Sequence, residues 1–196
     1  MSAVIELPDW LTSTLASDAI GGVGAMDGPL PIRGGQLIAG YASTVTVAAG
    51  DNLDLREAVR RGPDPGPILV VASAGPSNRA AMGGLVANAM ACRGFRAVII
   101  DGRVRDLAEL RDLELLQVWC RGVTPVAPGK AGGGQVGGEV LCAGVSVSPG
   151  DVVVADDDGV VVWPSGRVEE LLELARQRLE SDLQRQAEIA GGGELK

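Results

Sequence analysis

The sequence feature that most constrains the fold is the segment from Gly84 to Glu109, GLVANAMACRGFRAVIIDGRVRDLAE. Its pattern predicts a helix, a tight turn at Gly94, a buried strand over residues 97–100 and then a polar loop from Asp101 to Asp106. The polar residues follow the carboxyl end of a strand, where α/β folds usually place their binding and catalytic groups. This loop is therefore the first candidate for a functional site.

A second apolar run, at residues 68–72, predicts another strand that is covered on both faces. A helix predicted over about residues 79–93 connects the two strands, and such crossovers are almost always right-handed. This helix contains the pair Gly83-Gly84, and a glycine inside a helix costs roughly 1 kcal/mol relative to alanine. Either the regular helix begins near the pair and exposes backbone amides that can bind an anion, or the glycines allow close packing. The sequence leaves both readings open.

The remaining elements follow from the same periodicities. We predict helices over residues 11–20, from Leu53 onward, over 107–116 and over 167–190, and strands over 36–49, 117–120, 140–147, 152–155 and 160–163. The strand at 36–49 is expected to bend near Gly40, and the Gly-rich residues 121–139 are expected to be irregular. No internal repeat or linker divides the chain, which predicts a single domain over residues 1–196.

Four carboxylates, those of Asp151, Asp156, Asp157 and Asp158, gather around the late strands. The Asp158-Gly159 pair between two valine runs is a strong hairpin signal. Calcium binding is the alternative, but the spacing lacks the ligand ladder of an EF-hand. Turn formation is therefore the favoured interpretation.

Composition excludes several classes of function. The net charge of -8, without a cluster of basic residues, disfavours nucleic acid as a partner, and aromatic residues are only 3% of the chain. No apolar run is long enough to cross a bilayer, and the first ten residues carry acids where a secretory leader has basic residues. We therefore expect a cytoplasmic protein that binds neither nucleic acid nor membrane.

The absence of histidine removes the commonest general base and transition-metal ligand. The two lysines, Lys130 in the segment PGKAGGG and Lys196 at the chain end, are poorly placed for Schiff-base chemistry. Three widely spaced cysteines, Cys92, Cys120 and Cys142, each follow an apolar residue, so we expect buried, reduced thiols. Carboxylates, arginines and backbone amides remain for chemistry, and any metal is expected to be bound by oxygen.

Adjacent side chains at the end of a strand are expected to diverge, so Arg105 and Asp106 could bind different groups. An arginine grips a carboxylate with two hydrogen bonds, whereas an aspartate supplies the hard oxygen that magnesium or manganese prefers. A metal bound to a 2-oxo acid stabilises an enolate, which both retro-aldol cleavage and oxaloacetate decarboxylation require. The alternative is a surface cluster of ion pairs of little energetic value, made by Arg103, Arg105, Asp106 and Glu109.

Several motifs extend this picture: SDAI at residues 17–20, GDN at 50–52, VIIDGRVRD at 98–106 and PGDVVVADDDGVVVWP at 149–164. The pattern G-x20-R-D-x2-E/D is met by Gly84, Arg105, Asp106 and Glu109. Over about residues 17–164 the chain resembles the family that joins class II 4-hydroxy-4-methyl-2-oxoglutarate aldolases to the regulator of ribonuclease E activity A.

The resemblance implies an α/β fold of the swivelling β/β/α type, a three-layer single domain, here with a C-terminal helix. It also implies homotrimers or homohexamers with active sites between subunits. Asp106 would lie at a Mg2+ or Mn2+ ion, with Glu109 in the outer water shell and Asp101 close enough to order waters. Arg105 would bind the pyruvoyl carboxylate, and the amides of Gly84 and Leu85 would bind it from the other side.

By the same resemblance, the chain would be a metal-dependent lyase that releases pyruvate from a 4-hydroxy-2-oxo acid, with oxaloacetate decarboxylation as an expected side activity. Asp106 favours catalysis, because the regulatory branch of the family commonly lacks the aspartate after the arginine. The alternative function is a non-catalytic regulator that binds a partner protein. Two departures from the family pattern, Ala143-Gly144 for paired glycines and Gln117 for a proline, bear mainly on substrate identity.

Overall fold

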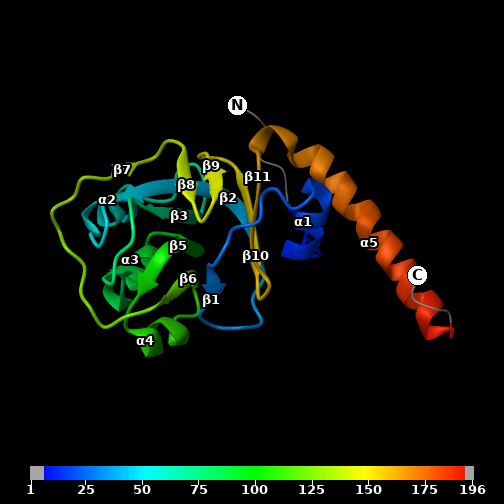
Figure 1. The fold of residues 1–196 in the computed structure, drawn as a ribbon, viewed down its shortest axis with the longest axis horizontal. Helices are drawn as coiled ribbons and strands as arrows, with labels where there is room; N and C mark the ends of the chain where they lie inside the picture. Colours follow the sequence, from blue (N-terminus) through cyan, green and yellow to red (C-terminus); the bar gives the residue numbers. More distant parts are fainter. Residues whose placement is uncertain (1–6, 193–196) are drawn as a thin grey trace.

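The computed structural model describes residues 7–192, and one nine-stranded mixed sheet organises them (Figure 1). The sheet order is β1-β6-β5-β3-β2-β10-β11, with β4 paired to β5 and β7 paired to β2. The strands are β1 (Leu30–Pro31), β2 (Ile38–Val47), β3 (Ile68–Ser73), β4 (Ala80–Met82), β5 (Ala97–Val104), β6 (Gln117–Val123), β7 (Gln135–Val136), β10 (Val152–Asp156) and β11 (Gly159–Trp163). The ends of the sheet, β1 and β11, contact each other, so the sheet is nearly closed like a barrel.

Parallel pairing is confined to the middle of the sheet. Strands β2, β3, β5 and β6 run parallel, and each is connected to the next through a helix. Strand β2 pairs with β10 from Ile38 to Tyr41 and with β3 from Ala42 onward, so it changes neighbour next to the predicted bend at Gly40. A separate hairpin, β8 (Val140–Cys142) with β9 (Val145–Val147), completes the strands.

The helices cover two different faces of the molecule. They are α1 (Ser13–Ile20), α2 (Leu53–Arg61), α3 (Gly84–Cys92), α4 (Leu107–Asp112) and α5 (Val168–Ala190). Helices α2, α3 and α4 cover one face of the parallel strands, and their apolar sides bury Leu55, Met90 and Leu110 against them. Helices α1 and α5 instead pack on β10 and β11 around the fully buried Trp163. In Figure 1, α5 extends well beyond the rest of the chain.

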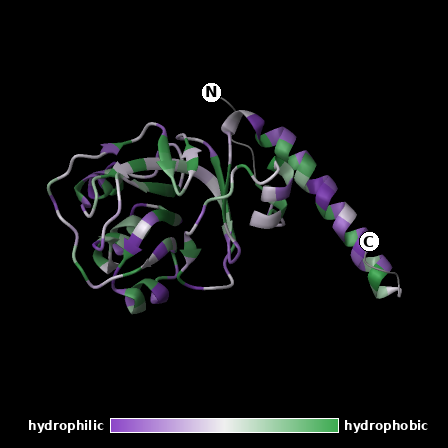
Figure 2. Cartoon of the chain, viewed as in Figure 1, coloured by the Kyte–Doolittle hydropathy of each residue, from purple (hydrophilic) through white to green (hydrophobic). Residues whose placement is uncertain are grey.

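A third group of buried apolar residues lies between the one under α2, α3 and α4 and the one under α1 and α5. Trp119 on β6 is completely buried there, with valines of β10 and β11 and with Val140, Cys142 and Val147 of the β8–β9 hairpin. Apolar residues accordingly colour the central strands in Figure 2, whereas the outer face of α5 is largely hydrophilic. The layered arrangement confirms the predicted α/β swivelling fold with its C-terminal helix.

Several predicted element boundaries were wrong. Strand β5 continues to Val104, so the segment from Asp101 to Val104 is strand and not loop. The helix expected from about residue 79 begins only at Gly84, because residues 80–82 form β4 against the extended end of β5. Helix α4 is shorter than predicted, and residues 140–147 form a hairpin.

Other expectations about the chain were confirmed or lie beyond the structure. Strands β10 and β11 form the predicted hairpin around Asp156 and Gly159. Within residues 7–192, no helix is both long and apolar enough to cross a membrane. Lys196 lies outside the described residues.

Candidate active site at the ends of β4 and β5

The site is built on the pairing of a three-residue strand with the end of β5. Met82 is in register with Val104, and the amide of Arg105 donates a hydrogen bond to the carbonyl of Met82 at 2.9 Å. The residues after β4, Gly83 and Gly84, therefore lie beside the residues after β5. Two turns that are about twenty residues apart in sequence become neighbours in space.

Gly83 and Gly84 serve both functions that the sequence left open. Gly83 is the N-cap of α3 and Gly84 its first residue, so the regular helix does begin at the pair. A Cβ atom on Gly83 would overlap the Asp106 carboxylate, and one on Gly84 would overlap that of Glu109. The pair thus starts the helix and also admits two acidic side chains to its N-terminus, where the helix dipole favours negative charge.

Asp106 has an unusual backbone. Its φ of 59° and ψ of 43° are left-handed, a conformation that costs a non-glycine residue energy and that often accompanies function. Its Oδ2 accepts a hydrogen bond from the Gly84 amide at 3.1 Å and lies 3.4 Å from Arg105 Nε. The prediction that the side chains of Arg105 and Asp106 diverge was therefore wrong, because the two form an ion pair. Its Oδ1 has no partner in the described part of the chain, and the side chain is 41% exposed, so one carboxylate oxygen is open to a ligand.

The two backbone amides predicted to bind substrate differ. The Gly84 amide donates to Asp106, whereas the Leu85 amide has no acceptor among residues 7–192. Leu85 is 84% exposed and lines the cavity. Of the two amides, that of Leu85 is the one free to bind an anion.

Glu109 is held against the start of α3 by a residue that the sequence analysis missed. Asn88 donates from Nδ2 to Glu109 Oε1 at 2.9 Å, and also to the carbonyl of Gly84 at 2.9 Å. Asn88 lies one helical turn after Gly84, a spacing that could have pointed to it. The amide therefore fixes the Glu109 carboxylate near the turn that carries Asp106.

The donor set suits a magnesium-type ion. Mg2+ retains several waters and usually takes only one or two protein carboxylates. Asp106 offers its free Oδ1, and Glu109 is near enough to bind waters. Within residues 7–192, no three or more acidic or thiol groups gather as a closed metal cage. An open, partly hydrated site at Asp106 is the arrangement that these residues fit.

Asp101 and Arg103 line a different cavity from Arg105 and Asp106. Asp101 forms an ion pair with Arg121, and its Oδ2 accepts a hydrogen bond from the Ala143 amide at 2.9 Å. Both residues line a second cavity of about 480 Å³. Of the surface cluster considered as an alternative, only Arg105 and Asp106 form an ion pair among the described residues.

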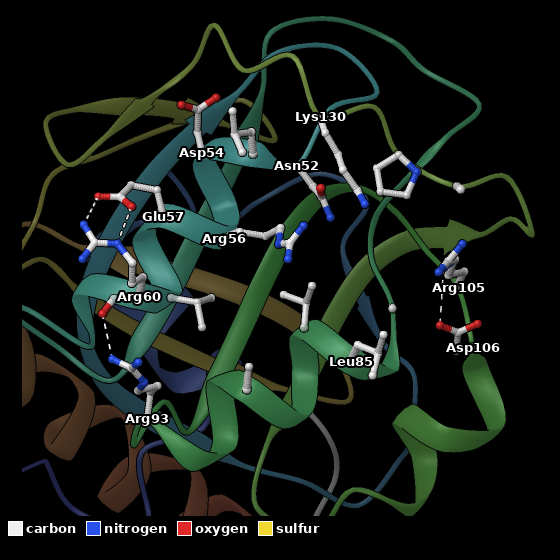
Figure 3. A pocket seen from close by; sticks show the side chains of 17 residues that line it. Asn52, Asp54, Arg56, Glu57, Arg60, Leu85, Arg93, Arg105, Asp106 and Lys130 are labelled. Atoms are coloured by element: carbon white, nitrogen blue, oxygen red, sulfur yellow. Dashed lines mark hydrogen bonds and ion pairs between the residues drawn. The ribbon is translucent and has the colours of Figure 1, made fainter.

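The cavity that contains Arg105 and Asp106 extends beyond the residues predicted for the site. It measures about 840 Å³ and reaches from Leu85, Arg105 and Asp106 to the start of α2, where Asn52 and Arg56 lie (Figure 3). Lys130, from the Gly-rich segment, also lines it. Sequence reasoning had placed no functional residue there, although the GDN motif ends at Asn52.

Asp51 attaches the Gly-rich segment to α2. Its carboxylate accepts hydrogen bonds from the amides of Leu53 at 2.8 Å, Ala131 at 2.6 Å and Gly132 at 3.1 Å. Burial of Asp51 opposes its ionisation, but these amides outweigh the burial and lower its pKa below the ordinary value. The charged Asp51 therefore fixes the loop that carries Lys130.

The cysteines lie outside this site. Cys120 and Cys142 are buried as predicted, and burial raises the pKa of Cys142 to about 12. The prediction for Cys92 was wrong, because it lies at the exposed C-terminal end of α3. Ala91, the apolar residue before Cys92, is only partly buried. An apolar neighbour in the sequence therefore did not show whether the Cys92 thiol is buried.

Comparison with known proteins identifies the family. The model of the RraA-like family, described as Aldolase/RraA, matches residues 13–162. The chain therefore belongs to the Aldolase/RraA family, as its motifs and its fold indicated.

Individual relatives come from both branches of that family. A Halalkalibacterium halodurans protein named “Putative 4-hydroxy-4-methyl-2-oxoglutarate aldolase” is 33% identical over 181 residues, which are 92% of this chain and 85% of that protein. Streptomyces coelicolor RraAS2, described as an unusual member of the RNase ES inhibitor RraA family, superposes with a TM-score of 0.81 and 26% identity, over 90% of this chain and 93% of that one. The RNA-processing inhibitor RraA from Thermus thermophilis gives a TM-score of 0.69 with 28% identity, over 79% of this chain and 93% of that one.

Proposed function

We propose that this protein is a divalent-metal-dependent carbon–carbon lyase that releases pyruvate from a 4-hydroxy-2-oxo acid and also decarboxylates oxaloacetate. The observation that carries the proposal is the shared cavity of Arg105, Asp106 and Leu85, on two turns that the β4–β5 pairing holds together. A planar cation, a free carboxylate oxygen and a free amide are the groups needed to bind a 2-oxo acid beside a metal ion.

Each residue has a distinct role in this proposal. The guanidinium of Arg105 binds the carboxylate next to the keto group, and the Leu85 amide donates to it from the other side. Asp106 holds Mg2+ or Mn2+ through Oδ1, and Glu109 orders the outer waters. When bound, the ion supplies Lewis-acid stabilisation of the negative charge that develops on the keto oxygen. In the reaction the C3–C4 bond breaks, the 4-hydroxyl group loses its proton to become a carbonyl, and the pyruvate methyl group gains a proton.

Pyruvate release, coupled to lactate dehydrogenase, tests the proposal. Activity on a 4-hydroxy-2-oxo acid should require added Mg2+ or Mn2+ and disappear with EDTA. Asp106→Ala should lower kcat/KM by about 100-fold or more, the usual scale for removing a group that stabilises charge in a transition state. Asp112→Ala is the matched control, because it removes an exposed carboxylate at the end of α4, the helix that Asp106 precedes. Turnover without metal, or full activity of Asp106→Ala, would refute the lyase.

The second candidate is a non-catalytic regulator that binds a partner protein. The similarity to the RNA-processing inhibitor RraA and to an unusual member of the RNase ES inhibitor RraA family favours it, as does the net charge of -8. Adding the protein to an RNase E-type endonuclease and following RNA cleavage distinguishes the two functions. Inhibition of cleavage together with no lyase activity on any 2-oxo acid would support the regulator.

A further inference from the structure

The second cavity, of about 480 Å³, lies where the strand pairing of β5 is interrupted. Strand β3 pairs with β5 as far as Ile100, and β4 pairs with it only from Arg103 onward. The pairing of β5 with β6 is irregular over the same interval. Asp101 and Gly102 therefore line an opening at the carboxyl ends of the parallel strands, the place where open α/β sheets bind ligands.

This second cavity is separate from the one that contains Arg105 and Asp106. Within residues 7–192, the two cavities share no lining residue. Val71 and Ile100, each 1% exposed, contribute to an apolar part of the second cavity. Its polar part comes from the ends of β5 and β6 and from the loop over residues 74–79, which connects β3 to β4. The cavity can therefore hold a ligand of its own.

The two carboxylates that line the second cavity are already engaged. Asp51 accepts hydrogen bonds from three backbone amides, as described above. Asp101 forms an ion pair with Arg121 and accepts a hydrogen bond from the Ala143 amide at 2.9 Å. The charge of Arg121 is therefore compensated, and neither acid pairs with the other two arginines of the cavity.

Those two arginines, Arg79 and Arg103, have no acidic partner. Arg103 is exposed and forms no hydrogen bond or ion pair with any residue in the described range 7–192. Arg79 donates from Nη1 to the carbonyl of Ala127 at 2.8 Å, which leaves its charge uncompensated. Ala80, the next residue, is in register with Arg103, so the two arginines come from neighbouring strands. Two uncompensated cations at one cavity attract an anion.

The loop between β3 and β4 adds neutral hydrogen-bond donors. The amides of Gly75 and Ser77 have no acceptor among residues 7–192, and both residues line the cavity. Ser77 Oγ accepts a hydrogen bond from the Arg79 amide at 3.0 Å, so its hydroxyl proton is free to donate. A Cβ atom on Gly50 would overlap Ser77 Oγ, which shows that the loop packs closely against the end of β2.

The number of donors indicates which anion fits. Two guanidinium groups, two amides and one hydroxyl group surround the cavity. A carboxylate offers them one charge and two oxygens, whereas a phosphate monoester offers a charge of about −2 at neutral pH and three terminal oxygens. The cavity is also larger than a phosphate group alone requires, and its apolar lining suits a carbon skeleton.

We propose that the second cavity binds the phosphate monoester of a small organic molecule. Arg79 and Arg103 bind the phosphate group, and the amides of Gly75 and Ser77 donate to its remaining oxygens. The carbon skeleton lies against the apolar lining near Ile100. This inference does not depend on the proposed lyase function, because no residue of the second cavity takes part in that reaction.

Calorimetry with glycerol 3-phosphate as the probe, at constant ionic strength, tests the proposal. The wild-type protein should bind one molecule per chain, at least tenfold more tightly than inorganic phosphate, because the ester also buries carbon groups. Glycerol should not bind. Arg103→Gln should weaken the binding about tenfold or more, as expected for the loss of charge-assisted hydrogen bonds, without a change in Tm. Arg176→Gln, which removes an exposed arginine on α5, is the matched control.

A further variant, Arg105→Gln, distinguishes the two cavities, because Arg105 lines only the other one. Its affinity for glycerol 3-phosphate should equal that of the wild type. Weaker binding in Arg105→Gln with none of the loss in Arg103→Gln would place the anion in the proposed active site and overturn the inference. Equal affinities for inorganic phosphate and for the ester would overturn the assignment of a phosphate monoester. Absence of binding in a protein that releases pyruvate would refute the second site and leave the lyase standing.

Discussion

Gly84 has no side chain, and this leaves the space that the Glu109 carboxylate occupies. We expect Gly84→Ala to displace the Glu109 carboxylate, which a Cβ atom would overlap, and to lower lyase kcat/KM about tenfold or more. The fold should tolerate the change, because alanine is favoured over glycine in a helix by about 1 kcal/mol and offsets part of the clash. The variant should therefore lose activity with little change in Tm.

The matched control for this change is Gly166→Ala, since no heavy atom lies within 4 Å of the added Cβ and its φ is not positive. Both its Tm and its kcat/KM should match those of the wild type. Wild-type activity in Gly84→Ala would show that the position of Glu109 does not matter for the reaction.

The residues of the candidate site differed in how far the sequence could predict them. Gly84, Arg105, Asp106 and Glu109 follow the fixed spacing of the family pattern, so the resemblance proposed all four as site residues. Asn52 and Lys130 could not be predicted in the same way. They come together only because the Asp51 carboxylate accepts amide hydrogen bonds from a segment about 80 residues later in the chain.

At the scale of elements, hydrogen bonds attach the start of α1 to the β10–β11 hairpin. Asp156 accepts hydrogen bonds from the amide and the hydroxyl of Ser13 and, at 3.0 Å, from the Asp158 amide. Asp156→Ala should lower the free energy of unfolding by about 2–3 kcal/mol, since it leaves several donors without their charged acceptor. Urea denaturation measures the change.

The neighbouring Asp158 is the control for that experiment, because it is exposed and its carboxylate has no partner within the described part of the chain. Asp158→Ala should change the free energy of unfolding by less than about 0.5 kcal/mol. Equal effects of the two substitutions would contradict the assigned contacts. The contacts themselves support the turn interpretation of this acidic segment, since Asp157 also accepts from the Gly35 amide.

Elements that carry their own local signal were predicted best. The Asp-Gly hairpin and the amphipathic α5 were recognised because a turn pair and a helical period are local properties of the sequence. Strand β4 was missed, because three residues contain too little periodicity and their pairing depends on the end of β5. The end of β5 was also missed, because the polar residues from Asp101 to Arg103 interrupt the apolar run that predicted the strand.

At the scale of the whole molecule, the cavity rim carries exposed apolar side chains. Leu85 is 84% exposed and Leu53 43%, and both line the cavity. Apolar groups around a polar cavity are typical of surfaces that another chain covers. This distribution supports the proposal, first drawn from the family resemblance, that the protein forms a trimer or a hexamer with its site between subunits.

Sedimentation equilibrium tests this assembly, since a trimer of the 20.0 kDa chain has a mass of about 60 kDa. Leu85→Glu should dissociate the assembly, because it would place a charge in the apolar contact that the proposed interface buries, and specific lyase activity should fall with it. Val23→Glu, at a residue 81% exposed and next to β11, is the control and should keep both mass and activity. A wild-type protein that sediments as a single chain at full specific activity would refute the shared site, because one chain would then complete the cavity around Arg105 and Asp106 by itself.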